Sequence, residues 1–119
     1  DASHCGLLPE SQFPPMVAVQ QARDSAMASS LGQTQPNRLS ILIAGNYHVR
    51  QDLGVPNYLL ASNSDLERDD IVSLAFMEVS EELTNAGDYV ESTAGVSAYD
   101  YIWFTPAVSN EDYCASLRK

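Results

Sequence analysis

The segment Leu39-Ser40-Ile41-Leu42-Ile43-Ala44-Gly45-Asn46-Tyr47-His48 carries the strongest structural signal in this chain of 119 residues. Its first six residues are mostly apolar and predict a buried β-strand, and the four from Gly45 to His48 predict a turn at the strand's carboxyl end. A short predicted helix opens at Pro56, soon after the turn. Because open α/β sheets bind their ligands at the carboxyl ends of strands, His48 is the leading candidate for chemistry.

Three further segments carry the signals of regular structure. They are a helix from Pro14 or Pro15 to Leu31 ended by Gly32, a core strand over Ile71–Val79, and an aromatic strand over Tyr99–Thr105 ended by Pro106. The acidic stretch between the two strands is ambiguous, with a helical turn over Glu81–Asn85 and a short strand at Tyr89–Val90 as its candidates. This order predicts an α/β fold, a layered sheet of at least three strands with flanking helices. Because sheets usually have about five or six strands, we expect residues 1–119 to form one domain or half of a larger one.

The composition excludes some partners. Sixteen Asp and Glu stand against six Lys and Arg, a formal net charge of −10. Such a surface repels phosphate backbones and anionic lipid, so we expect no nucleic-acid partner. No apolar run reaches the roughly 18 residues of a membrane-spanning helix. The chain begins at Asp1 and not at Met, so we expect a preceding segment that was removed or left out.

Two cysteines lie near opposite ends of the chain. Cys5 and Cys114 predict either one disulfide that closes nearly the whole chain, in an oxidising compartment, or two free thiols in a reducing one. Neither belongs to a Cys-x-x-Cys pair or to a His/Cys cluster, so the sequence gives no indication of a structural zinc site.

The turn after the predicted strand holds two candidate ligands. The imidazole of His48 can ligate a metal ion or haem iron, or act as a general base, and the alternative is a hydrogen bond across the turn. The phenolate of Tyr47 can ligate haem iron, and the alternative is ordinary packing. We expect Gly45 to allow the sharp turn beside His48. Asp52 is the expected hydrogen-bond acceptor that orients the imidazole.

Three other residues are weaker candidates. Arg23 falls on the predicted apolar face of the first helix, where it either binds a carboxylate such as a haem propionate or extends along the helix edge. Arg50 is a second candidate for propionates. His4 is a candidate second ligand, and the alternative is a loop histidine beside a cysteine. No serine has a recognisable nucleophile setting. Enzyme activity stays open at this point, with a binding role favoured over it.

Several spaced motifs resemble one known family. They are His4-Cys5-Gly6 with Leu8-Pro9, Met16-Val17, Gln20 with Arg23-Asp24 and Met27-Ala28, Ile43 to Arg50 with Asp52 and Gly54-Val55-Pro56, and the ending Asp100 to Pro106 with Asp112 and Cys114. In this order they resemble the second half of the ChaN-like haem-binding uptake proteins, in the Tiki/TraB superfamily. Tyr47 stands where that family often has glycine, and it either narrows a pocket or adds an iron ligand.

The resemblance implies a haem-binding protein of bacterial iron uptake. It implies a lipoprotein or periplasmic protein of the cell envelope, in some cases a dimer that shares haems, and it fits a Cys5–Cys114 bridge. It also implies that this chain functions with an upstream half of the same domain. The alternative within the superfamily is a metal-dependent hydrolase or peptidase that uses a Gly-x-x-His motif, which Gly45 to His48 match in form, with a divalent ion at His48. Those enzymes need the upstream motif.

Overall fold

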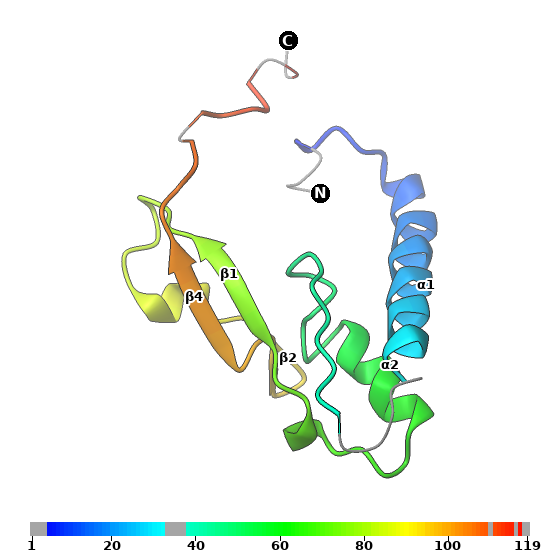
Figure 1. Cartoon of the computed structure of the whole chain (residues 1–119). Helices are drawn as coiled ribbons and strands as arrows, with labels where there is room; N and C mark the ends of the chain where they lie inside the picture. The colour runs from blue at the N-terminus through cyan, green and yellow to red at the C-terminus, as the bar shows by residue number, and fades with distance from the viewer. Residues whose placement is uncertain (1–4, 33–37, 110, 116, 118–119) are drawn as a thin grey trace.

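The structure, a computed structural model, describes residues 5–32, 38–109, 111–115 and 117. Its α-helices are α1 (Phe13–Leu31) and α2 (Val55–Ser62), and its 3-10 turns are η2 (Glu10–Gln12), η3 (Arg68–Asp70) and η4 (Ala86–Tyr89). Its strands are β1 (Leu74–Glu78), β2 (Ser92–Thr93), β3 (Val96–Ser97) and β4 (Tyr101–Thr105). Figure 1 shows α1 along one side of the molecule and the β1–β4 pair along the other.

The first helix begins and ends where the sequence predicts. Its first turn holds two prolines, whose missing N–H groups would have no partner inside the helix in any case, and Gly32 caps its end through a hydrogen bond to the carbonyl oxygen of Ala28. Its buried face differs from the predicted one, however. The buried residues of α1 are Asp24 and Ala28, whereas Val19 and Arg23 are exposed. The helix packs against α2, and its buried Asp24 contacts His48 in the turn before α2.

The sheet is smaller than predicted. β1 and β4 pair in parallel, with Phe76 opposite Trp103, and β2 and β3 form a separate antiparallel pair. Among the described residues the sheets therefore have two strands each, so the expected layered sheet of three or more strands is not seen. The fold is a mixture of helices and strands.

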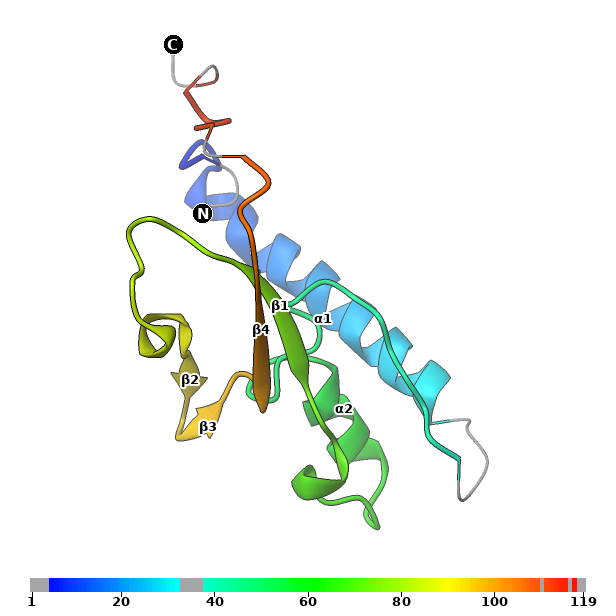
Figure 2. The same cartoon turned by 60° about the vertical axis from the view of Figure 1, so that its left-hand side comes forward.

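The predicted strand over residues 39–44 belongs to neither sheet. Figures 1 and 2 place this segment between the β1–β4 pair and α1. A strand needs a neighbour to complete its ladder of hydrogen bonds, and in the described chain this segment has none. Its alternate side chains Leu39, Ile41 and Ile43 are 89%, 75% and 93% exposed. The apolar pattern is therefore that of a strand, but no strand of the described structure pairs with this segment.

The acidic stretch before β4 folds differently from the prediction. Tyr89 ends the 3-10 turn η4 and is not in a strand, and Glu81–Asn85 form no helix. Strands β2 and β3 instead make a tight hairpin, seen beside β4 in Figure 2. Its two turn residues, Ala94 and Gly95, have φ of 52° and 80°. Positive φ at both positions is the geometry that matches the twist of a two-residue hairpin.

The chain buries few large side chains. The buried apolar residues of the described chain are Ala28, Val55, Ala75 and Ala98, and beside them lie Asp24, Arg50, Gln51 and Ser73. The rings of Phe76 and Trp103 contact each other on one face of the sheet, with centroids 6.3 Å apart, and both are exposed. The centre of the fold is therefore held as much by polar contacts as by apolar ones.

A disulfide joins Cys5 to Cys114, with their Cα atoms 5.3 Å apart and a sequence separation of 109. This confirms the predicted bridge between the two cysteines. The bond ties the segment before α1 to the segment after β4, and Figure 1 shows these two segments at the same end of the molecule. In the described ranges, none of the helices has the length and apolar character needed to cross a membrane.

Candidate functional site

Residues 46–49 form the predicted turn, and its backbone is held at both ends. The amide of His48 donates to the carbonyl oxygen of Gly45 at 2.9 Å, and the amide of Val55 donates to the carbonyl oxygen of His48 at 2.8 Å. Gly54 makes this second contact possible, because a Cβ there would lie 2.8 Å from the carbonyl carbon of His48. At Gly45 a Cβ would meet only Cδ2 of His48, at an ordinary 3.9 Å. The glycine that the turn requires is therefore Gly54 and not, as expected, Gly45.

The imidazole of His48 is held by a carboxylate from α1. Its Nδ1 lies 2.6 Å from Oδ1 of Asp24, and the two side chains are 20% and 8% exposed. An ionised carboxylate can only accept hydrogen bonds, so this contact favours the tautomer with the proton on Nδ1. The lone pair of Nε2 is then free to act as a ligand or a base. No hydrogen bond to Nε2 comes from the described residues.

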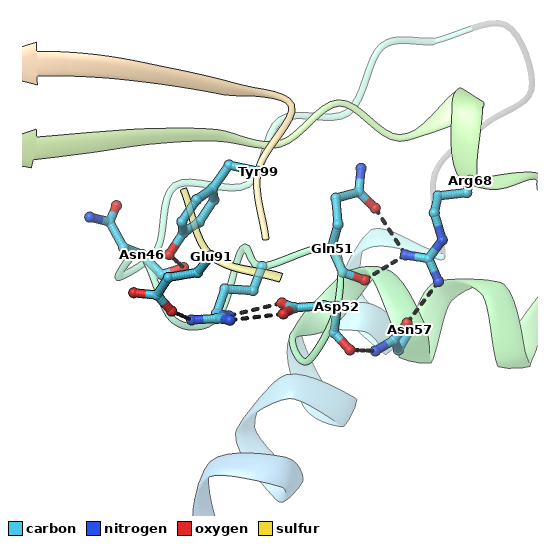
Figure 3. A network of polar contacts seen from close by, with 8 residues as sticks. Asn46, Gln51, Asp52, Asn57, Arg68, Glu91 and Tyr99 are labelled. Atoms are coloured by element: carbon cyan, nitrogen blue, oxygen red, sulfur yellow. Dashed lines mark hydrogen bonds and ion pairs between the residues drawn. The ribbon is translucent and has the colours of Figure 1, made fainter. Parts of the chain in front are cut away.

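The expected partner of the imidazole, Asp52, has another role. Both of its carboxylate oxygens accept hydrogen bonds from Arg50, from Nε and Nη2 at 2.8 Å each, and the side chain of Asp52 is fully buried. Nη1 of Arg50 binds Glu91 (Figure 3). The hydrogen bonds that Arg50 donates hold the pKa of Asp52 below its usual value, and the same bonds to Asp52 and Glu91 raise the pKa of Arg50. Arg50 therefore ties the turn to the stretch before the hairpin, and its charge is balanced inside the protein.

A second group of polar contacts supports the same turn. Arg68 donates to the carbonyl oxygen of Gln51 and, at 3.0 Å, to Oδ1 of Asn57 (Figure 3). The hydroxyl of Tyr99 donates to the carbonyl oxygen of Asn46, and its partial burial raises its pKa. Asn46 in turn donates to the carbonyl oxygen of Phe76 on β1 at 2.7 Å. These bonds fix the turn between α2 and the sheet, which stops the backbone at His48 from moving freely.

The other predicted site residues are dispersed. The ring of Tyr47 is exposed, and the guanidinium carbon of Arg50 lies 5.3 Å from its centroid. Arg23 is exposed on α1, and within the described chain no hydrogen bond or ion pair joins it to His48 or Tyr47. His4 lies outside the described residues. Of the sequence-predicted candidates, the structure thus brings Tyr47 and Arg50 together beside His48.

Two hollows mark the surface of the described chain. One, of about 340 Å³, lies along α1 and is lined by Pro15, Met16, Val19, Gln20 and Arg23. The other, of about 240 Å³, lies between η4 and β4 and is lined by Ala86, Val90, Glu91, Tyr99, Asp100, Ile102 and Phe104. The first is an apolar groove with one guanidinium at its rim. It is the only one of the two that includes a predicted site residue, Arg23.

Asp24 is a residue of the candidate site that the sequence did not reveal. It directly follows Arg23 in the sequence. One signal was present, because Asp24 and Ala28 lie four residues apart and thus share one side of the helix. No group of three or more His, Cys, Asp or Glu side chains that could hold a metal ion is found among the described residues. The site is thus a single imidazole with a buried carboxylate behind it, which is a donor set suited to one axial bond rather than to a metal cage.

An imidazole that is held by a carboxylate, as His48 is by Asp24, has the chemistry of a metal ligand. Residues 1–59 match the family described as haem-binding uptake, Tiki superfamily, ChaN. That part of the chain belongs to this ChaN-like family, and it includes both Asp24 and His48. Searches among curated proteins and among solved structures give no match.

Proposed function

We propose that this chain binds haem as cargo, through a bond between the haem iron and Nε2 of His48. The observation that carries the proposal is the 2.6 Å contact between Nδ1 of His48 and Asp24, inside the region that matches the family. Imidazole is a common axial ligand of haem iron, and ligating histidines almost always donate their other N–H to a carboxylate, a carbonyl oxygen or water. The side chain of His48 is also 20% exposed, which leaves part of it open to a ligand.

Arg23 is the guanidinium best suited to a propionate in this proposal. It is exposed at the rim of the groove that Met16 and Val19 line, and guanidinium binds carboxylate with charge-assisted hydrogen bonds. Arg50 is less suited, because Asp52 and Glu91 already occupy its donors. Tyr47 is the alternative iron ligand, since its ring is exposed next to His48.

We further infer that the chain functions in the bacterial cell envelope together with a second polypeptide, either an upstream half of the same protein or another copy. Support for the compartment comes from the Cys5–Cys114 bridge, because disulfides persist in oxidising compartments. Support for the partner comes from the apolar side chains of residues 39–44, which the described chain leaves uncovered, because large exposed apolar patches often mark interfaces.

A haem titration of the purified protein, followed by absorbance, tests the proposal. We expect a saturable shift of the Soret band and a loss of affinity of about tenfold to a hundredfold in His48→Ala. His4→Ala is the matched control, since it removes the chain's other histidine, and Tyr47→Phe tests the alternative ligand. A flat titration of folded protein would refute haem binding. A loss confined to His4→Ala or Tyr47→Phe would refute His48 as the ligand. The mass of the complex in solution tests for a second copy.

A further inference from the structure

Asp24 is an unusual residue for the exposed helix that carries it. Its neighbours Arg23 and Ser25 are exposed, whereas Asp24 is 6% exposed. Burying a carboxylate costs several kcal/mol unless hydrogen bonds compensate for it. The hydrogen bond that the described structure gives this carboxylate is the one to His48. The other buried charged side chains, Arg50 and Asp52, bind each other. Asp24 differs from them because its partner, His48, keeps Nε2 as a free ligating atom.

The charge of Asp24 changes the ligand that His48 offers. A carboxylate that accepts from Nδ1 fixes the ring's orientation and tautomer, and it strengthens the electron donation from Nε2 to a bound metal ion. Such a ligand stabilises the more highly charged ferric ion more than the ferrous ion, which is one way that a protein tunes haem through hydrogen bonds beyond the ligand itself.

We propose that Asp24 is a positioning residue that makes the site selective for ferric haem over ferrous haem. The inference rests on the proposed function, because it takes His48 as the iron ligand, and it adds the oxidation state of the cargo. It involves no electron transfer by the protein, since selectivity here is the ratio of two binding constants. A chain that binds in an oxidising compartment, as the disulfide suggests, would meet iron in this same oxidation state.

Asp24→Asn tests the selectivity, because it keeps the size of the side chain and removes its charge. Affinities for ferric haem and for dithionite-reduced haem are measured for both proteins. We expect the ferric-to-ferrous ratio to fall at least tenfold in the variant, which equals a rise of about 59 mV in the reduction potential of the bound haem. Asp65→Asn, at an exposed position, makes the same charge change as a matched control and should leave the ratio unchanged. An unchanged ratio in folded, haem-binding Asp24→Asn would overturn the inference and leave haem binding intact.

A second measurement needs no haem. Nitrogen-15 NMR of the haem-free wild-type protein reports which ring nitrogen of His48 carries the proton. We expect the proton on Nδ1 in the wild type and a shift toward Nε2 in Asp24→Asn, with Asp24→Glu restoring part of the wild-type signal. A wild-type protein with the proton on Nε2 would overturn the positioning role even if Asp24→Asn fails to fold. Absence of haem binding with the proton on Nδ1 would instead refute the proposed function.

Discussion

Gly54 and Gly45 flank the same histidine but differ in what surrounds them. A methyl group at Gly54 would press against the carbonyl group of His48 and lie 3.0 Å from the carbonyl oxygen of Arg50, whereas one at Gly45 meets an ordinary contact. We therefore expect Gly54→Ala to lower the free energy of unfolding by about 1–3 kcal/mol, the cost of overpacking a close-packed site. Urea unfolding followed by circular dichroism measures it.

The matched control for this prediction is Gly45→Ala. Its expected effect is about 0.5 kcal/mol or less, typical of surface substitutions away from special features. Equal losses of unfolding free energy in the two variants would mean that the close approach of Gly54 to the carbonyl group of His48 does not make this position sensitive to an added methyl group. Haem affinity should follow the same order, because Gly54 lets the backbone of His48 bond to Val55.

At the residue scale the sequence predicted the candidate ligand but not its support. His48 was found because a turn follows an apolar run, which is a local signal. Asp24 lies 24 residues before it in sequence, and nothing local distinguishes a helix acid that faces another element from one that faces water. The expected acceptor, Asp52, was nearer in sequence, but Arg50 lies two residues from it and holds both of its oxygens.

Among the elements, the β2–β3 hairpin has a turn geometry that a single substitution can test. Ala94 holds a positive φ of 52°, a conformation that costs residues with a Cβ about 1–2 kcal/mol and that asparagine tolerates better. We expect Ala94→Asn to raise the free energy of unfolding by about 1 kcal/mol, because Asn-Gly is the preferred pair for this turn. Thermal unfolding compared with Ala107→Asn, an exposed position without positive φ, measures it. No gain over that control would contradict the prediction.

Elements with local signals were predicted well. Two prolines and a glycine mark the ends of α1, and Pro56 marks α2. The aromatic run predicted β4, although the observed strand begins two residues later than predicted, at Tyr101. The segment over residues 39–44 has an equally clear pattern but no ladder in the described chain, because pairing depends on a neighbour and not on the segment itself. The hairpin was missed because Ala-Gly is a weak turn signal.

For the whole molecule, the Cys5–Cys114 bond should be the largest single stabilising contribution. In the chain-entropy description, a bond that closes a loop of about 100 residues contributes about 4.7 kcal/mol, and the core that it supports has few buried apolar side chains. We expect reduction with dithiothreitol to lower the free energy of unfolding by about 4–5 kcal/mol, measured by urea unfolding with and without reductant. The Cys5→Ser/Cys114→Ser double variant should be weakened equally and should not respond to reductant. A stable reduced protein would contradict the expectation.

The sulfur bridge also decides how the protein carries a mechanical load. A pull on the chain outside Cys5 and Cys114 would pass from one tail to the other through the covalent S–S link. Force would bypass the helices, the sheet and the turn at His48, which would keep their shape under tension. With the bridge intact, a molecule held at one end and pulled at the other would thus not lengthen between the two cysteines. Only after a thiol has reduced the bridge would the force reach the folded interior.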